Sequence, residues 1–458
     1  MEAPSAGPVT LGARIAALDV IRGIALFGIL VVNMSFFAGP LADAVYDPSL
    51  VDAPIVDRVA WLVESTFFTG KFISLFSFLF GAGLTLQMAR MDAARASARS
   101  RGERGRSTPL LVVRRMAILL AFGLCHALLL WYGDILVYYA FVGLVLLPLR
   151  RFSARTVAAM ALAFAALSFA CAAGLGALQL LSTLAPAAGQ VERANADTDD
   201  EGAGEVDDAP TSFVEAFAAG GYVITQPALR EIEIATYREG PLADVLAMRA
   251  LQWASLIPVT VLFYLAHIIT MALAGMCAAK ARLFDASADR VQRAVAKSCL
   301  PIGVALTATA SLLVLTSGFD PAQLRFAVAS PLGDVGAIVL ALGYAALLAR
   351  LARHPAFEAA MRPIASTGRM ALTVYLSETV LMTGLMYWWG FARFATFARS
   401  ELFVIAIVTW LVLVALSNAW LAFFAMGPIE WLWRIGTYLS IPPLRRSADR
   451  RAEASDAT

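Results

Sequence analysis

The sequence predicts an all-α protein, a polytopic transmembrane helical bundle. Hydrophobic residues make up 60% of its 458 residues and charged residues only 15%, whereas a typical soluble domain has about 25% charged residues. So few charges cannot cover a water-exposed surface over this length. The lengths of the apolar runs and the placement of the arginines lead to the same fold class.

About ten segments have the length and composition of a membrane span. The hydrocarbon core of a bilayer is about 30 Å thick, so a helix needs about 20 mostly apolar residues to cross it. The predicted spans lie near residues 15–37, 63–88, 111–131, 134–149, 155–184, 253–279, 297–317, 332–351, 367–389 and 402–425. A cleaved secretory signal is the alternative for the first segment, because "ADA" at 42–44 offers a small-residue cleavage site.

The arginines predict which ends of the spans face the cytoplasm. Residues 89–115, between the second and third spans, are dense in arginine, and basic loops stay in the cytoplasm. Counting spans outward from that loop puts the other basic segments on the same side, namely residues 149–155, 280–297, 349–362 and 444–451. Both termini are therefore predicted to be cytoplasmic.

The chain divides into four predicted regions. They are an N-terminal transmembrane region at 1–184, an outer-side region at 185–252, a C-terminal transmembrane region at 253–440 and a basic cytoplasmic tail at 441–458. The outer-side region begins with an acidic loop at 191–210 that is poor in apolar residues. Apolar and charged residues then alternate at helical spacing over 211–253. This pattern indicates amphipathic helices that either pack on the outer surface or form a lid over an outer-facing pocket.

Three polar residues stand out in the first span. A charge at mid-bilayer costs at least about 2.5 kcal/mol, so such residues usually face the protein interior. Asp19 and Arg22 are three residues apart on one helical face and can form an ion pair. Asn33 lies eleven residues after Arg22, about 16 Å further along the helix axis. Its amide can orient a nucleophile or hold an oxyanion, or it can hydrogen-bond a neighbouring helix.

Lys71 begins the apolar run of the second span, which also contains Gly81 and Gly83. The two glycines predict close contact with another helix. For the lysine there are two interpretations: its ammonium extends to the outer interface, or it binds an anionic group of a substrate.

Two of the three histidines lie within apolar spans. His126 is in the outer half of the third span, eight residues before Asp134, and Gly133 marks a turn that lets Asp134 cap the next helix. A neutral imidazole in a low-dielectric pocket can act as a base or a nucleophile, and a nearby carboxylate would orient it. A hydrogen-bonded core histidine is the alternative. His267 is the rival candidate.

The last spans add a further charged set. Glu378 lies in the middle of a span and must be satisfied there. Arg369, near the inner end of the same span, can contact a phosphate. Glu430 and Arg434 are four residues apart on an expected interfacial helix, and we favour a structural role for this pair.

Five motifs together resemble the YeiB-like bacterial membrane proteins. In chain order they are "LDVIRGIALFGILVVN", "GKFISLFSFLFGAGL", "HALLLWYGDIL", "GRMALTVYL" and "GPIEWLWR", and they extend from residue 18 to residue 434. The resemblance implies a multi-pass protein of the bacterial inner membrane, in contact with membrane lipids.

The first region is also similar to the catalytic region of heparan-α-glucosaminide N-acetyltransferase and, more distantly, to bacterial membrane O-acyltransferases. That similarity implies transfer of an acyl group from cytosolic acyl-coenzyme A, most simply acetyl-CoA, to a glycan or lipid acceptor beyond the membrane. The O-acyltransferases resemble this chain at Arg22 but have a histidine at Asn33. The heparan enzyme has an asparagine there and a histidine soon after, which this chain lacks. We infer that His126 takes that role.

Two functional hypotheses follow. In the first, an acyltransferase, His126 accepts the acyl group or deprotonates the acceptor with Asp134 and Asn33 beside it. Arg22, Arg369 and Lys71 would bind the coenzyme, and Asp19, His267 and Glu378 are supporting or alternative residues. In the second, a small-metabolite transporter, the same ionisable groups line a transport path, although no inverted repeat is found. We expect no metal and no nucleic acid, and a homodimer is possible.

Overall fold

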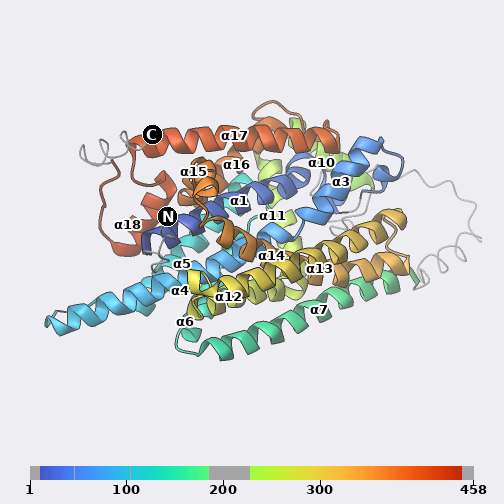
Figure 1. Ribbon diagram of the computed structural model, residues 1–458. Coiled ribbons are helices and arrows are strands. Elements are labelled where there is room, and N and C mark those ends of the chain that lie inside the picture. Colours follow the sequence, from blue (N-terminus) through green and yellow to red (C-terminus); the bar gives the residue numbers. More distant parts are fainter. Residues whose placement is uncertain (1–10, 46, 104, 185–226, 446–458) are drawn as a thin grey trace, which may run out of the picture.

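The computed structural model describes residues 11–45, 47–103, 105–184 and 227–445. Helices dominate these residues, and the only β-type pairing among them is an isolated bridge between Phe424 and Arg445. The long helices lie roughly side by side and form one elongated bundle (Figure 1). The predicted all-α membrane bundle is therefore confirmed for the described residues.

The N-terminal half forms nine helical elements in order. They are α1 (Leu11–Ala38), α2 (Leu41–Val45), the 3₁₀ turn η1 (Pro48–Val51), α3 (Ile55–Phe67), α4 (Lys71–Ser100), α5 (Thr108–Cys125), the π-helical η2 (His126–Leu130), α6 (Leu136–Leu149) and α7 (Ala154–Leu184). A turn at Gly70, whose φ of 81° suits glycine, separates α3 from α4.

The C-terminal half resumes after the residues that are not described. Its elements are α10 (Pro227–Glu239), α11 (Leu242–Val259), the π-helical η3 (Thr260–Tyr264), α12 (Leu265–Lys280), the 3₁₀ turn η4 (Ala286–Ala288), α13 (Asp289–Thr316), α14 (Leu324–Leu351), α15 (Pro355–Arg369), α16 (Ala371–Met386), α17 (Arg399–Phe423) and α18 (Pro428–Tyr438).

Each of the ten predicted apolar segments falls on helix, but the segments differ in length. By length and composition, eight helical stretches of the described residues can cross a membrane, and α6, α12 and α16 are apolar but shorter. The predicted span at 253–279 is part of a longer helix, because α11, η3 and α12 follow one another without a break over 242–280. At 1.5 Å per residue this helix is about 58 Å long, more than a bilayer core.

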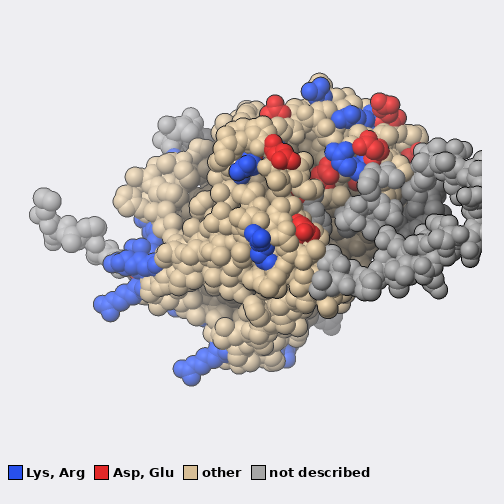
Figure 2. All heavy atoms as spheres, turned by 90° about the vertical axis from the view of Figure 1, so that its right-hand side faces the viewer, with Lys and Arg blue, Asp and Glu red and all other residues tan. Residues whose placement is uncertain are grey.

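The two ends of the bundle differ in charge. The inner half of α4, the α6–α7 and α12–α13 turns and both ends of the described chain lie at the left of Figure 1, which we call the basic end. The arginine pattern predicts that this end faces the cytoplasm. At the opposite end lie α3 and α10, where acidic and basic side chains gather on the upper part of the face in Figure 2. The predicted acidic loop at 191–210 lies outside the described residues.

Small residues set the closest helix contacts. Gly81 of α4 packs on the backbone of Ala272 in α12, and Gly275 of α12 packs on the backbone of Phe78, so a methyl group at either glycine would clash. Gly368, at the end of α15, packs in the same way on Asp19 of α1. These contacts place α4 against α12, and α15 against the inner half of α1.

Candidate active site: an arginine-lined cavity and two buried histidines

A cavity of about 1000 Å³ opens within the basic end of the bundle. Residues of α1, α4, α5, α6, α15, α16 and α18 line it. Along α4 it extends from Phe76 to Ala98, which is about 33 Å at the rise of a helix. Its volume lies at the upper limit for ligand pockets. The cavity therefore fits a long ligand rather than a compact one.

Seven arginines line this cavity, and only two carboxylates, those of Asp19 and Glu430, do so. Arg22 donates to Asp19 at 2.9 Å, as its spacing in the sequence predicted. Within the part of the chain that the structure describes, no carboxylate pairs with any of the other six, which are Arg90, Arg95, Arg106, Arg115, Arg369 and Arg434. An excess of unpaired positive charge in a recess attracts anions.

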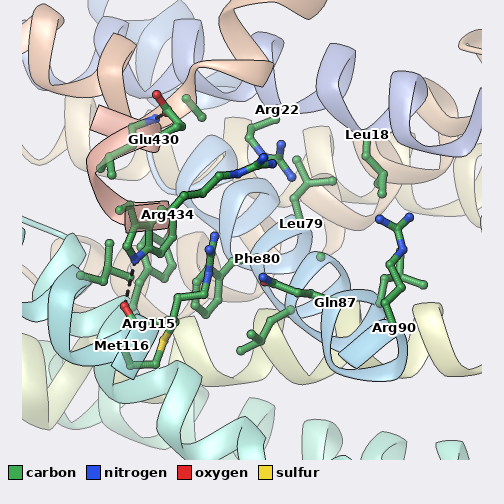
Figure 3. A pocket seen from close by; sticks show the side chains of 18 of the residues that line it. Leu18, Arg22, Leu79, Phe80, Gln87, Arg90, Arg115, Met116, Glu430 and Arg434 are labelled. Atoms are coloured by element: carbon green, nitrogen blue, oxygen red, sulfur yellow. Dashed lines mark hydrogen bonds between the residues drawn. The ribbon is translucent and has the colours of Figure 1, made fainter. Parts of the chain in front are cut away.

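Three of these arginines reach the same part of the cavity from different helices. In Figure 3 the side chains of Arg22, Arg115 and Arg434 extend toward one another from α1, α5 and α18. The guanidinium of Arg115 lies 3.5 Å from the ring centroid of Trp433, and the indole of Trp433 donates to the Arg115 carbonyl at 2.9 Å. Trp433 thus holds Arg115 in place while its charge stays available to a ligand.

Glu430 and Arg434 form no ion pair in the part of the chain that the structure describes. Instead Oε1 of Glu430 accepts the amide of Leu372 at 2.7 Å and that of Thr373 at 3.1 Å, and its Oε2 accepts the Thr373 hydroxyl. The carboxylate therefore caps the start of α16, whose first amides lack partners within the helix. Burial raises the pKa of Glu430, and the hydrogen bonds from Thr373 and the backbone act in the opposite direction.

The apolar end of the cavity is closed by two tyrosines, Tyr139 and Tyr375. The hydroxyl of Tyr139 is 3.0 Å from that of Ser77 on α4. The hydroxyl of Tyr375 points to the Gly133 carbonyl, at 3.4 Å. The two tyrosines thus connect this wall of the cavity to α4 and to the turn before α6.

His126 lies directly behind Tyr375. The two rings are 5.0 Å apart between centroids. Nδ1 of His126 is 3.0 Å from Oδ1 of Asp134, and Nε2 is 2.9 Å from the Thr379 hydroxyl. The other oxygen of Asp134 accepts the amide of Val137 at 2.8 Å, so this residue does cap α6. The structure brings His126 and Asp134 together, but His126 does not line the cavity.

Local backbone geometry positions this histidine. His126 begins η2, whose π-helical turn ends when the amide of Trp131 donates to the His126 carbonyl at 2.9 Å. Such insertions into α-helices are frequent at functional sites. Asn33 is half-buried on α1 and lines neither cavity described for the chain. No hydrogen bond joins Asn33 to His126 or Asp134 among the described residues.

His267 has a similar set of partners elsewhere in the bundle. Its Nδ1 is 2.6 Å from Oδ1 of Asp334, and its Nε2 is 2.5 Å from the hydroxyl of Ser74. The second oxygen of Asp334 accepts the hydroxyl of Ser168 at 2.9 Å. Tyr264 stacks on the imidazole, with the two ring planes 5° apart. This array joins α4, α7, α12 and α14.

The remaining predicted residues separate into two groups. Arg369 lines the cavity beside Arg22. Lys71 does not line the cavity. The expectation that its ammonium extends to the outer interface is wrong, because the residue is 3% exposed and the ammonium donates to the Ser65 carbonyl at 2.5 Å. The turn at Gly70 places the ammonium against the last turn of α3. Glu378 is 2% exposed, and its Oε1 has no partner among the described residues.

Sequence reasoning missed several cavity residues. Arg90, Arg95 and Arg115 counted only as loop charges that set the orientation, and Tyr375 and Thr379 carried no signal of their own. A helical repeat was available in α4, where Leu79, Phe80, Gly83, Gln87, Arg90, Ala94 and Ala98 share one face. A face that changes from apolar to basic along one helix is the pattern that could have revealed the cavity.

Comparison with known proteins gives a consistent family. The profile of a family described as "Protein of unknown function (DUF418)" matches residues 278–440. The Escherichia coli protein named "Uncharacterized protein YeiB" is 30% identical over 431 residues, covering 92% of this chain and 95% of that protein. "Uncharacterized protein YxaH" of Bacillus subtilis is 29% identical over 452 residues, covering 96% and 98%. No solved structure matches the chain.

Proposed function

The chain belongs to the YeiB family, and on that membership and the arginine-lined cavity we propose that it is an integral membrane acyltransferase of the bacterial inner membrane. It takes an acyl group from acyl-CoA at the basic end and passes it to a glycan or lipid acceptor on the other side. The observation that carries the proposal is the cavity itself, with unpaired arginines in one part and an aromatic end against His126.

The shape and chemistry of the cavity suit acyl-CoA as the donor substrate. Its phosphates would meet Arg22, Arg115 and Arg434, since guanidinium groups bind phosphate oxygens in pairs. The pantetheine arm would follow the apolar face of α4 past Leu79. The thioester would then reach Tyr375 at the far end. Arg369 would bind beside Arg22, and Lys71 is left out of this role.

His126 would provide the proton transfer. The acceptor oxygen bonds to the thioester carbonyl carbon, the carbon–sulfur bond breaks, and the acceptor proton passes to Nε2 of His126 and then to the departing thiolate. Asp134 holds Nδ1 and so keeps Nε2 available. Nε2 can alternatively carry the acyl group itself between two half-reactions.

The proposal requires Tyr375 to move. In the structure its ring separates His126 from the cavity, and Thr379 occupies Nε2. Rotation of the Tyr375 and Thr379 side chains would join Nε2 of His126 to the donor. Substrate-linked movements of this kind complete many catalytic sites.

The decisive experiment is incubation of the purified full-length protein with radiolabelled acetyl-CoA and bacterial envelope membranes. We expect label in a glycan or lipid fraction, and no label when the His126→Gln variant replaces the wild type. Failure of the wild-type protein to transfer label would contradict the proposal. Uptake of an unmodified metabolite into liposomes by the same preparation would favour the transporter instead.

A further inference from the structure

A second, smaller cavity lies at the opposite end of α1. It measures about 240 Å³ and is lined by residues of α1, α2, η1, α3, α10 and α17 and of the loops between them. We call this second cavity the outer pocket. Ile29 lines the arginine-lined cavity, and Ser35 lines the outer pocket. The two residues are six positions apart, or about 9 Å along the helix. The two voids thus border the same helix less than two turns apart.

A layer of aromatic side chains near the outer end of α1 contacts the His126 array, which consists of His126, Asp134 and Thr379. Phe37 of α1 packs on Trp131 with ring centroids 4.0 Å apart, and Trp131 packs edge-on against His126 at 6.2 Å. The indole N–H of Trp131 is buried and has no partner among the described residues. A buried donor without a partner is costly, so this layer offers a hydrogen bond to a group that enters it.

The walls of the outer pocket carry positive and negative side chains and a hydroxyl group that can still donate a hydrogen bond. Asp43, Asp47 and Asp57 line it together with Arg230 and Arg399. Ser35 is 7% exposed and accepts from Arg399, and its own hydroxyl proton is given to no acceptor within the described ranges.

Such walls select the class of ligand. Hydroxyl groups both donate and accept, so carboxylates and guanidinium groups side by side suit them. The negative charge of the three carboxylates repels a phosphate group. The volume of the pocket suits one sugar-sized group rather than a nucleotide.

A helix closes one side of the pocket. Arg230 of α10 pairs with Asp43 of α2 at 3.0 Å. Glu233, one turn later, accepts the amide of Leu41 at 3.2 Å. Both contacts reach α2, so α10, which lies within the segment predicted to pack on the outer surface or form a lid, is held against the segment that follows α1.

We propose that the outer pocket binds the acceptor of the acyl transfer through a polyhydroxylated, unphosphorylated group of the size of one sugar. That the ligand is the acceptor rests on the proposed function. The binding site itself is inferred from the pocket alone. A free saccharide and the headgroup of a glycolipid present the same chemistry. Both are therefore included in the test.

The pocket can be filled without disturbing the fold. A side chain at Gly39 meets only the Ser35 carbonyl, at 3.9 Å from its first carbon, and Gly39 lines the pocket. Gly39→Leu therefore adds bulk into the void. Gly174→Leu is the matched control, because nothing lies within 4 Å of a side chain there and Gly174 lines neither cavity.

The first measurement does not need activity. Ser49→Cys, in a variant whose four native cysteines are replaced, places an exposed thiol on the pocket wall. We expect methyl β-glucoside, or vesicles containing glucosyl diacylglycerol, to slow its labelling by a membrane-impermeant maleimide, whereas glucose 6-phosphate does not. Gly39→Leu should remove this protection and Gly174→Leu should keep it. No protection by either sugar probe, or equal protection in the Gly39→Leu variant, overturns the proposal.

The second measurement separates this proposal from the first one. With radiolabelled acetyl-CoA, Gly39→Leu should raise the KM for the protecting sugar at least about tenfold while the affinity for acetyl-CoA stays unchanged. If the wild type transfers no acetyl group but the sugar still protects Ser49→Cys, the acyltransferase fails and the site remains. If transfer occurs and Gly39→Leu leaves that KM unchanged, the outer pocket is not the acceptor site.

Discussion

The two buried histidines have nearly the same partners and very different surroundings. Each has a carboxylate at Nδ1 and a hydroxyl at Nε2. Each also lies at a π-helical segment, since His126 begins η2 and His267 follows η3 by three residues. Yet only His126 lies behind the wall of the arginine-lined cavity.

The two arrays also differ in what they connect. Arg249 of α11 donates to the Leu129 carbonyl in η2, and Gln252, one turn further, donates to Glu233 on α10. The His126 array is thus linked to the helix that closes the outer pocket. His267 joins four helices of the bundle and borders neither cavity. A hydrogen-bonded histidine is therefore not a site by itself, and the neighbouring void makes the difference.

The largest expected effect tests directly whether the two histidines differ in function. His126→Gln should lower kcat for acetyl transfer about a hundredfold to ten-thousandfold, because a positioned acid–base group is lost. Its affinity for acetyl-CoA, measured by calorimetry, should stay unchanged. His267→Gln should retain kcat per folded molecule. The reverse pattern would move the active site to His267.

The next effect concerns the donor. Arg115→Ala and Arg434→Ala should each weaken acetyl-CoA binding about tenfold to a hundredfold, because a hydrogen bond to a charged group contributes about 1.5–3 kcal/mol. Arg353→Ala is the control, since Arg353 is also at the basic end but pairs with Asp289 at 2.9 Å. Equal losses of acetyl-CoA affinity in all three variants would mean that only the general positive charge of the basic end attracts the ligand.

A smaller effect tests the structural role of the other array. Ser74→Ala leaves Nε2 of His267 without its partner and should lower the free energy of unfolding by about 1–3 kcal/mol. Ser100→Ala, on an exposed residue of the same helix, should change it little. Denaturation in detergent followed by tryptophan fluorescence measures both. An unchanged stability in Ser74→Ala, with loss of acetyl transfer, would argue for a catalytic role.

The last effect is a pH dependence at the outer face. Burial raises the pKa of Glu233 to about 8 from its ordinary value of 4.5. Between these values the folded protein holds a proton that the unfolded chain has lost. The contribution of Glu233 to stability therefore falls as pH rises from about 4.5 to 8, by at most about 1.4 kcal/mol per pH unit.

Hydrogen exchange can follow this dependence locally. After correction for intrinsic rates, protection of the α10 amides should decrease over that range in the wild type and stay level in Glu233→Gln, which keeps the acceptor for Gln252. Unchanged protection of the α10 amides in the wild type would contradict this pH dependence. Loss of protection at η2 over the same range would show that the link through α11 is functional.

Much of the fold could be read from the chain because bilayer thickness and burial act on every residue of a span. The apolar segments, the pairing of Asp19 with Arg22 and the approach of α4 at Gly81 all follow from local spacing. Glu430 and Arg434 are spaced closely enough to pair but do not, because the amides at the start of α16 bind that carboxylate instead. Spacing along one helix cannot reveal a competitor on another.

The sequence by itself determined that this is a helical membrane protein with a basic end, and that His126 and Asp134 are close enough to meet. Composition and the 3.6-residue period are local properties, so they suffice for those conclusions. Only the tertiary structure decided that arginines from α1, α4, α5, α15 and α18 surround one void and that the outer pocket borders the same helix, α1, less than two turns away. Cavities are spaces between distant segments, and no segment carries their shape alone.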